Sequence, residues 1–188
     1  MSLPTGFATP AQAVAPQPLH VVARDSFAAW RDAQPPAVQA WLAVHRFDGA
    51  AGTALAWADA QGQLAGAVIG IGDALDPHAY AHAPTALPGA DWQLAGSPGA
   101  GARCALQLGW GLGCYRFDRY KASTRAPARL VADDFDAETF DLLAACASVR
   151  DLVNTPTEHM GPDELEAAAR ALAQAHGAAV EVVAGDDL

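Results

Sequence analysis

The chain has 188 residues, 52% of them hydrophobic and 17% charged, a composition that describes a globular protein and excludes a disordered one. The formal net charge is −10, which argues against nucleic acid and anionic membrane surfaces as partners, because both need a basic face on the protein. No apolar run approaches the roughly 20 residues that cross a bilayer.

The first 18 residues contain neither the basic start nor the apolar centre of a signal peptide. Their Pro, Ala and Gln content favours a flexible tail over residues 1–18. The three cysteines, Cys104, Cys114 and Cys146, form no CxxC pair, which argues against a disulfide framework and a structural zinc site. We expect them to be small buried side chains of a cytoplasmic protein.

After the tail, residues 19–24 (LHVVAR) predict a buried strand. Pro35 and Pro36 are well placed at the start of a helix, whose residues Val38, Trp41, Leu42 and His45 follow at helical spacing. His45 is expected on the helix surface or packed against it, since no partner lies at metal-binding spacing.

Residues 52–59 and 64–73 are two strand-like runs separated by Ala60, Gln61 and Gly62, so they predict a hairpin or two adjacent strands. In the second run, residues 64–71 are apolar apart from the glycines, which is typical of a strand buried on both faces.

Residues 76–89 predict a loop with two histidines, His78 and His82, at a spacing that could bind a metal on a helix. Pro77, Pro84 and Pro88 leave room for little more than one helical turn, and no carboxylate motif of the HExxH kind accompanies the histidines. We therefore favour a solvated loop over a metal site. A short strand at 91–96 and a turn at 97–101 follow.

From Ala102 the sequence ARCALQLGWGLGCYRFDRYK predicts a helix with an apolar stripe, formed by Leu106, Trp110, Cys114 and Phe117. Gly109, Gly111 and Gly113 would each cost an isolated helix about 1 kcal/mol relative to Ala. We expect them to allow close packing against a neighbouring backbone. A phosphate cradle is rejected, because these glycines lie inside a helix and not in a strand-to-helix turn.

The remaining elements predicted are a strand at 128–133, a long amphipathic helix at 136–154, a second helix at 161–177 and a strand at 179–184. Asn154, Thr155 and Pro156 end the first of these helices. Gly161 and Pro162 suit the start of the second, and Gly177 its end.

Two stretches resemble the leucyl (cytosol) aminopeptidase family: YRFDRYK (residues 115–121) and RDLVNTPTEHMGPDELEAAARALA (residues 150–173). The second resembles the junction between that family's N-terminal and catalytic domains. The resemblance implies an α/β fold with a macro-domain-like mixed sheet flanked by helices, then a linker helix and the first helix and strand of a truncated second domain. The expected segments are a tail at 1–18, an N-terminal α/β domain at 19–133, a linker helix at 134–155 and the beginning of the peptidase domain at 156–188.

The resemblance also implies a parent enzyme that removes N-terminal residues from peptides with two divalent metal ions, zinc or manganese, and assembles as a hexamer. The family's catalytic and metal residues all lie downstream of the junction, and the chain ends at Leu188 before any compact set of carboxylates. We therefore expect no catalytic, cofactor-binding or metal residue in this chain, and a role in assembly and active-site access. Lys121 is the only lysine, and the adjacent Asp186 and Asp187 are expected to be solvated.

Two alternatives remain open. A free-standing macro-like module could hold ADP-ribose or a nucleotide beyond the strand ends, with 69–73 (IGIGD) and 97–101 (SPGAG) as the only candidate loops. A purely structural oligomerisation domain is the other.

Overall fold

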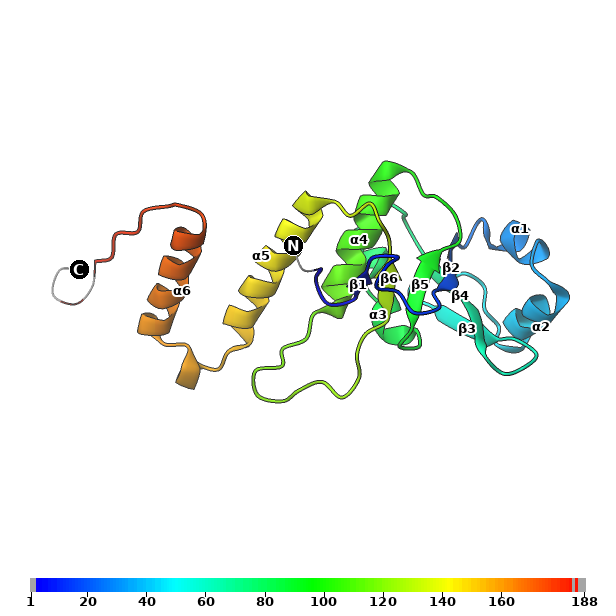
Figure 1. Cartoon of the computed structure of the whole chain (residues 1–188), viewed down its shortest axis with the longest axis horizontal. Coiled ribbons are helices and arrows are strands. Elements are labelled where there is room, and N and C mark those ends of the chain that lie inside the picture. Colours follow the sequence, from blue (N-terminus) through cyan, green and yellow to red (C-terminus); the bar gives the residue numbers. More distant parts are fainter. Residues whose placement is uncertain (1–2, 184, 186–188) are drawn as a thin grey trace. The chain divides into compact units, whose positions relative to one another are not determined.

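The structure is a computed structural model that describes residues 3–183 and 185. The chain divides into two compact units, Met1–Ala145 and Cys146–Leu188. Figure 1 shows the elements of each. Over the described residues, no helix combines the length and the apolar character that a membrane crossing requires.

The described residues of the first unit form one six-stranded sheet in the order β1-β6-β5-β2-β4-β3. Its strands are β1 (Phe7–Ala8), β2 (Gln17–Ala23), β3 (Ala54–Ala58), β4 (Leu64–Ile71), β5 (Asp91–Leu94) and β6 (Arg129–Val131). All pairings are parallel except that of β3 with β4, which is an antiparallel hairpin. The predicted hairpin is therefore confirmed, and Gly66 to Ile71 in β4 are buried throughout, as a strand covered on both faces requires.

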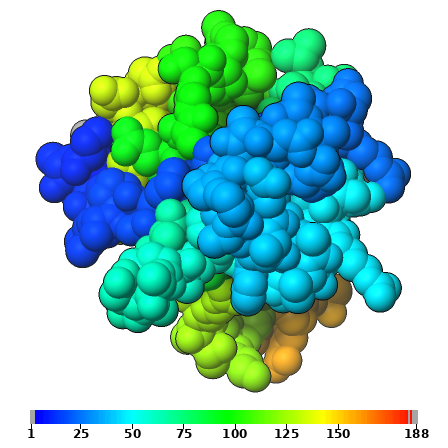
Figure 2. All heavy atoms as spheres, turned by 90° about the vertical axis from the view of Figure 1, so that its right-hand side faces the viewer, coloured from blue at the N-terminus to red at the C-terminus, as the bar shows by residue number. Residues whose placement is uncertain are grey.

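Alternate side chains of β2 and β4 point into two separate cores, because successive strand residues face opposite sides of a sheet. Leu19 and Ile69 belong to the larger core, which packs under η1 (Pro77–Tyr80), α3 (Ala83–Ala86), α4 (Ala100–Cys114) and the first turns of α5 (Ala137–Asn154). Val22 and Val68 belong to the smaller core, which packs under α1 (Phe27–Asp32) and α2 (Pro36–Val44). Figure 2 looks onto this second side, where α1 and α2 cover the middle of the face.

The smaller core contains a polar pair. The indole N–H of Trp30 donates to Nδ1 of His20 at 3.1 Å, and the His20 ring stacks on Trp57 at 5.9 Å between centroids. Burial lowers the pKa of His20, so the folded protein favours the neutral imidazole that accepts this bond.

Helix α2 also protects the free edge of the sheet. It begins at Pro36, as predicted, and His45 is its C-cap, with its ring 4.3 Å from that of Trp41. The indole N–H of Trp41 donates to the carbonyl of Ala56 in the edge strand β3 at 3.0 Å. One backbone acceptor of the exposed edge is therefore already occupied.

Helix α4 runs against η1 at very short range, which explains its glycines. A Cβ added at Gly109 would lie 1.8 Å from the carbonyl oxygen of Pro77, and one at Gly113 would lie 2.0 Å from that of Ala81. The predicted close packing against a neighbouring backbone is confirmed for Gly109 and Gly113, whereas a Cβ at Gly111 would meet the side chain of Leu143. The helix ends at Cys114, so Phe117 of the predicted apolar stripe lies in the following loop.

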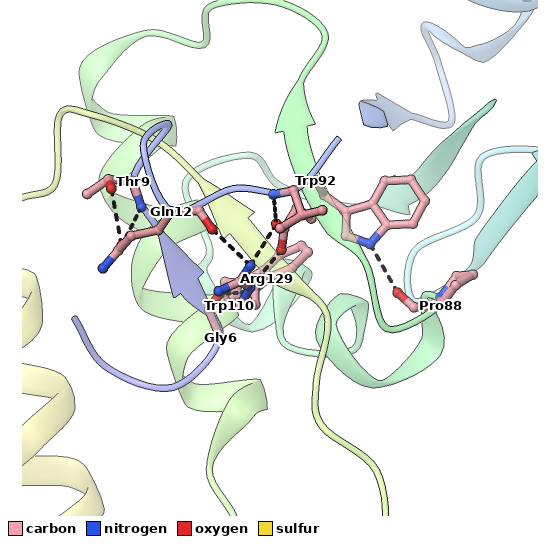
Figure 3. A network of polar contacts seen from close by, with 9 residues as sticks. Gly6, Thr9, Gln12, Pro88, Trp92, Trp110 and Arg129 are labelled. Atoms are coloured by element: carbon pink, nitrogen blue, oxygen red, sulfur yellow. Dashed lines mark hydrogen bonds and ion pairs between the residues drawn. The ribbon is translucent and has the colours of Figure 1, made fainter. Parts of the chain in front are cut away.

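The N-terminal segment is not a loose tail over its described residues, contrary to the prediction for residues 1–18. Phe7 and Ala8 are buried and pair with β6, and the carbonyl of Gly6 accepts a hydrogen bond from the Trp110 indole at 2.9 Å (Figure 3). The prediction failed because two apolar residues suffice to add a short strand to the edge of a sheet, and composition alone hides them.

An ion pair at the amino ends of β5 and β6 fastens the same segment. Arg129 donates to the carboxylate of the buried Asp91 through Nε at 2.6 Å and Nη2 at 2.7 Å, and also to the Gln12 carbonyl at 3.3 Å. The backbone N–H of Val14 donates to the same carboxylate at 2.6 Å. Burial alone would raise the pKa of Asp91, but the hydrogen bonds from Arg129 and Val14 outweigh it and lower that pKa.

The second unit contains the rest of α5, then η2 (Thr157–His159) and α6 (Pro162–Ala175). Helix α6 begins as predicted, with Pro162 at its first position and the Glu164 carboxylate accepting from the backbone N–H of Gly161 at 2.9 Å. No residue of α6 is buried, and Leu165 and Leu172 on its apolar face are 54% and 60% exposed.

The strand predicted at 179–184 is wrong for its described part. Residues 178–183 have no regular secondary structure, because a strand needs a hydrogen-bonded neighbour and the described residues place none beside them. Residue 184, like Asp186 and Asp187, lies outside the described residues.

Candidate functional site

Four parallel strands, β2, β4, β5 and β6, end at the same edge of the sheet, and the loops that follow them surround a cleft. In open α/β sheets this edge is where ligands bind, beside the strand at which the chain reverses its direction of winding. Here that strand is β2, which has β4 on one side and β5 on the other. Helix α4 begins at this edge (Figure 1).

The larger part of the cleft is a cavity of about 360 Å³ with apolar walls. Leu19, Ile71 and Leu106 form its buried floor. Small residues surround it and leave it open, namely Ala23, Ser26, Ala74, Ala95, Gly96, Ser97 and Ala102. Tyr80 also lines it, and its hydroxyl donates to the Ala74 carbonyl at 2.9 Å. Burial, with the charge of Asp73 adding to it, raises the pKa of Tyr80, so the phenol stays neutral.

The two candidate loops of the sequence meet at this cavity. Ile71 contributes from 69–73, and Ser97 and Pro98 contribute from 97–101. The second loop is shorter than predicted, because α4 already begins at Ala100.

A second cavity of about 240 Å³ lies beside the first and shares the loop of Gly96, Ser97 and Pro98 with it. Three of its polar side chains, Gln107, Asp134 and Arg103, are already paired. The buried Gln107 amide donates to the Asp134 carbonyl and accepts from the backbone N–H of Asp136, both at 3.1 Å. Asp134 forms an ion pair with Arg103. These side chains hold the chain that leaves β6.

The two histidines singled out as a weak metal candidate do not share a helix. His78 is exposed in η1, whereas His82 precedes α3 and is partly buried. Nε2 of His82 donates to the Thr53 carbonyl at 3.1 Å. Burial lowers the pKa of His82, although this hydrogen bond and one with Ala79 oppose the shift. The loop is therefore partly packed and not simply solvated.

The cysteines correct a second expectation. Only Cys114 is buried, and burial raises its pKa to about 12, so it is an inert thiol. Cys104 is exposed and Cys146 is half-buried. Among the residues that the structure describes, no cluster of three or more His, Cys, Asp or Glu side chains could hold a metal ion.

Comparison with known proteins identifies the family. A family model described as the M17 aminopeptidase N-terminal domain matches residues 17–133. A probable cytosol aminopeptidase of Mycobacterium sp. (strain JLS) is 34% identical over 38% of this chain and 17% of its own length. That of Mycobacterium bovis (strain BCG / Pasteur 1173P2) is 35% identical over 48% of this chain and 20% of its own length.

Solved structures are similar over almost all of the chain. The cytosol aminopeptidase of Coxiella burnetii matches with a TM-score of 0.84 and 27% identity, over 96% of this chain and 40% of that protein. The bottromycin maturation enzyme BotP shares the fold, with a TM-score of 0.67 and 24% identity over 93% of this chain and 40% of its own.

This chain therefore spans a fifth or less of the curated relatives named above. The resemblance predicted from YRFDRYK and from the junction sequence is confirmed, and so is a mixed α/β fold flanked by helices. The chain belongs to the M17 aminopeptidase family, and its residues 17–133 form that family's N-terminal domain.

Proposed function

We propose that this chain is the N-terminal, non-catalytic portion of a cytoplasmic, metal-dependent leucyl aminopeptidase that removes N-terminal residues from peptides. The observation that carries the proposal is the match to the Coxiella burnetii enzyme, which extends over 96% of this chain but only 40% of that one. The remaining part of such a parent would contain the peptidase chemistry.

Two divalent metal ions, zinc or manganese, would be held in that remaining part. Two-metal hydrolysis needs several carboxylates around both cations. The described residues of this chain offer no such donor set, so no step of the reaction is assigned to them. A related protein, BotP, has a solved structure in complex with Mn. In this proposal residues 156–188 begin the peptidase domain, and residues 19–133 serve assembly into a hexamer and access of peptides to the active site.

Two measurements test the proposal. An antibody raised against this chain should detect a species clearly larger than 19.4 kDa in extracts of the source cells. Immunoprecipitates of that species should release leucine from a leucyl chromogenic amide with added manganese, and a chelator should abolish the release. The 188-residue chain alone should be inactive in the same assay. A single band at the mass of this chain, or chelator-sensitive activity of the chain alone, would contradict the proposal.

A second candidate function is the binding of a small ligand such as ADP-ribose or a nucleotide. The observation that favours it is the convergence of both candidate loops on the 360 Å³ cavity at the strand ends. Against it, small and apolar side chains line most of this cavity, and the buried Gln107 of the neighbouring cavity already has its hydrogen-bond partners. We expect weak or no binding of ADP-ribose by calorimetry, and a dissociation constant in the low micromolar range would favour this second function.

A further inference from the structure

The larger cavity, at the carboxyl ends of the parallel strands, has the size of a small-molecule site. Its volume of about 360 Å³ lies within the range of about 300–1,000 Å³ that is usual for ligand pockets. The cavity reaches inward to Leu19, Ile71 and Leu106, whose side chains are almost fully buried. Apolar walls offer water few hydrogen bonds, so an apolar molecule that replaces this water gains free energy.

Small residues at the ends of several elements keep this cavity open. They are Ala23 at the end of β2, Ala74 after β4, Ala95 and Gly96 after β5, and Ala102 in the first turn of α4. Each alanine contributes one methyl group and the glycine none, so the side chains of the protein do not fill the space. Protein interiors leave few voids larger than a water molecule, and a space of this size beside the core therefore favours an occupant.

The charge around the cavity limits the class of ligand. The described residues that line it include no charged side chain, and the phenol of Tyr80, which is among them, is neutral because burial and the charge of Asp73 raise its pKa. Asp73 directly precedes the lining residue Ala74, so the nearest charge is negative. A phosphate or carboxylate in the cavity would lose its hydration without gaining a cation, and an uncharged molecule avoids this cost.

Two hydroxyl groups of lining residues act as hydrogen-bond acceptors towards a ligand. Tyr80 donates its proton to the carbonyl of Ala74 at 2.9 Å, and Ser26 donates its own to the carbonyl of Ala23 at 3.0 Å. A hydroxyl has one donor and two acceptor lone pairs, so each oxygen keeps acceptor capacity after its proton is used. Tyr80 is buried whereas Ser26 is exposed, which makes Tyr80 the acceptor nearer to the apolar floor.

We propose that this cavity binds an uncharged, largely apolar small molecule that donates one hydrogen bond to the hydroxyl oxygen of Tyr80. The apolar body of the ligand lies on Leu19, Ile71 and Leu106, and the small residues around them leave room for it. The site goes beyond the peptidase assignment and does not depend on it. Its ligand also differs in chemistry from ADP-ribose and nucleotides, whose phosphates are charged.

Indole is a suitable probe, because it is uncharged and apolar and has one N–H donor. In NMR spectra of the ¹⁵N-labelled 188-residue chain, indole should shift the amide signals of Tyr80, Gly96 and Ala102. A ligand of its size should bind with a dissociation constant of about 0.5 mM. Indoleacetate should bind at least about tenfold more weakly because of its carboxylate, and N-methylindole about fivefold more weakly because it has no donor. Equal affinities for the three probes, or no shift with indole, would contradict the proposal.

A variant that fills the cavity tests where indole binds. Ala102→Leu places a large side chain at the wall formed by the first turn of α4, and should weaken indole binding by at least about tenfold. The matched control is Ala100→Leu, the same exchange in the same turn at an exposed residue that is not part of the cavity wall, and it should bind indole like the wild type. Circular dichroism should establish that both variants are folded. Unchanged binding by folded Ala102→Leu, or equal weakening in the control, would overturn the assignment to this cavity.

Tyr80→Phe tests the hydrogen bond separately from the shape of the cavity. The variant keeps the ring and removes only the hydroxyl, so it should weaken indole binding about fivefold and leave the affinity for N-methylindole unchanged. Equal weakening of both probes, or of neither, would refute the role of the Tyr80 oxygen as acceptor.

Two further results would assign the cavity to a different occupant. Tighter binding of ADP-ribose than of indole would overturn the proposal in favour of the second candidate function. Shifts of the same amide signals on dilution of the protein alone would show that a second copy fills the cavity, and would overturn it as well. The larger species and its peptidase activity are measured in other experiments, so the proposed function survives either result.

Discussion

Replacement of Gly109 by alanine in α4 should destabilise the protein, although the same change stabilises most helices. Alanine gains about 1 kcal/mol over glycine in a helix interior. The new Cβ would lie 1.8 Å from the Pro77 carbonyl oxygen, about 1.6 Å short of an ordinary contact at 3.4 Å. The obstacle is backbone, which cannot rotate away, and overpacking of this kind costs about 3 kcal/mol. The net loss should be about 2 kcal/mol.

Gly111 supplies a matched control in the same helix. Its new Cβ would meet the Cδ1 atom of Leu143 at 2.3 Å, and this is the end of a flexible side chain. Gly111→Ala should therefore change stability by less than about 1 kcal/mol, since the helix gain offsets the movement of Leu143.

Urea unfolding followed by far-UV circular dichroism measures both variants against the wild type. The expected order of stability places Gly109→Ala clearly below the other two proteins. If Gly109→Ala were as stable as the wild type, α4 would not lie against η1 at the distance described. Equal losses in both variants would show that obstruction by backbone and by a side chain cost the same, which would refute the reasoning.

Other predictions concern the N-terminal segment, the smaller core and the second unit. Asp91→Asn should lower the free energy of unfolding by about 2 kcal/mol, since it weakens the ion pair between the buried Asp91 carboxylate and the half-exposed Arg129. It should also speed protease cleavage near residues 9–14, and a cleavage rate equal to wild type would argue against the fastening role of Asp91. Because the folded pKa of Asp91 is lowered, its stabilising contribution should be present at neutral pH and disappear as the pH falls through that lowered value. Burial lowers the pKa of both His20 and His82. Below about pH 6.5 the unfolded chain therefore binds more protons than the folded protein, and the free energy of unfolding should decrease as the pH is lowered. In His20→Gln this pH slope should be smaller, and an unchanged slope would exclude His20 as a contributor. Gly177→Ala should lower the stability of α6 by about 1 kcal/mol, because Gly177 has a φ of +66°, and a circular dichroism spectrum and melting curve identical to wild type would contradict this. Amide hydrogens of residues 178–183 should exchange rapidly in dilute protein, and strong protection in a demonstrated monomer would mean that they have a partner within the chain.

Much of the fold could be predicted because its signals are local. The signals are the continuous apolar run of β4, the proline pair before α2 and the Gly161–Pro162 start of α6. Each acts within a few residues. Even the purpose of Gly109 and Gly113 in α4 followed from their position inside a helix. Helix α1 was missed, because six residues with one buried side chain, Phe27, leave little periodic pattern.

What could not be predicted depends on distant partners. The strand Phe7–Ala8 exists because β6 and the Trp110 indole lie beside it, more than 100 residues later in the chain. The predicted strand at 179–184 failed for the converse reason, since apolar residues alone do not supply a neighbouring strand. The cleft was foreseen only as two candidate loops, and their convergence follows from the crossing of the chain over β2, which no short motif encodes. The macro-like character and the domain boundaries stay predictions.

The tryptophan that covers the edge of β3 has a consequence for how this protein behaves at high concentration. An open sheet edge invites another chain to extend it into a growing ribbon, the first event in many kinds of precipitation. Trp41 occupies the outward carbonyl of Ala56 at the middle of that edge, so an incoming strand would first have to displace a large ring. Trp41 therefore hinders the addition of further chains at β3, and a variant that lacks the Trp41 indole should aggregate visibly during purification.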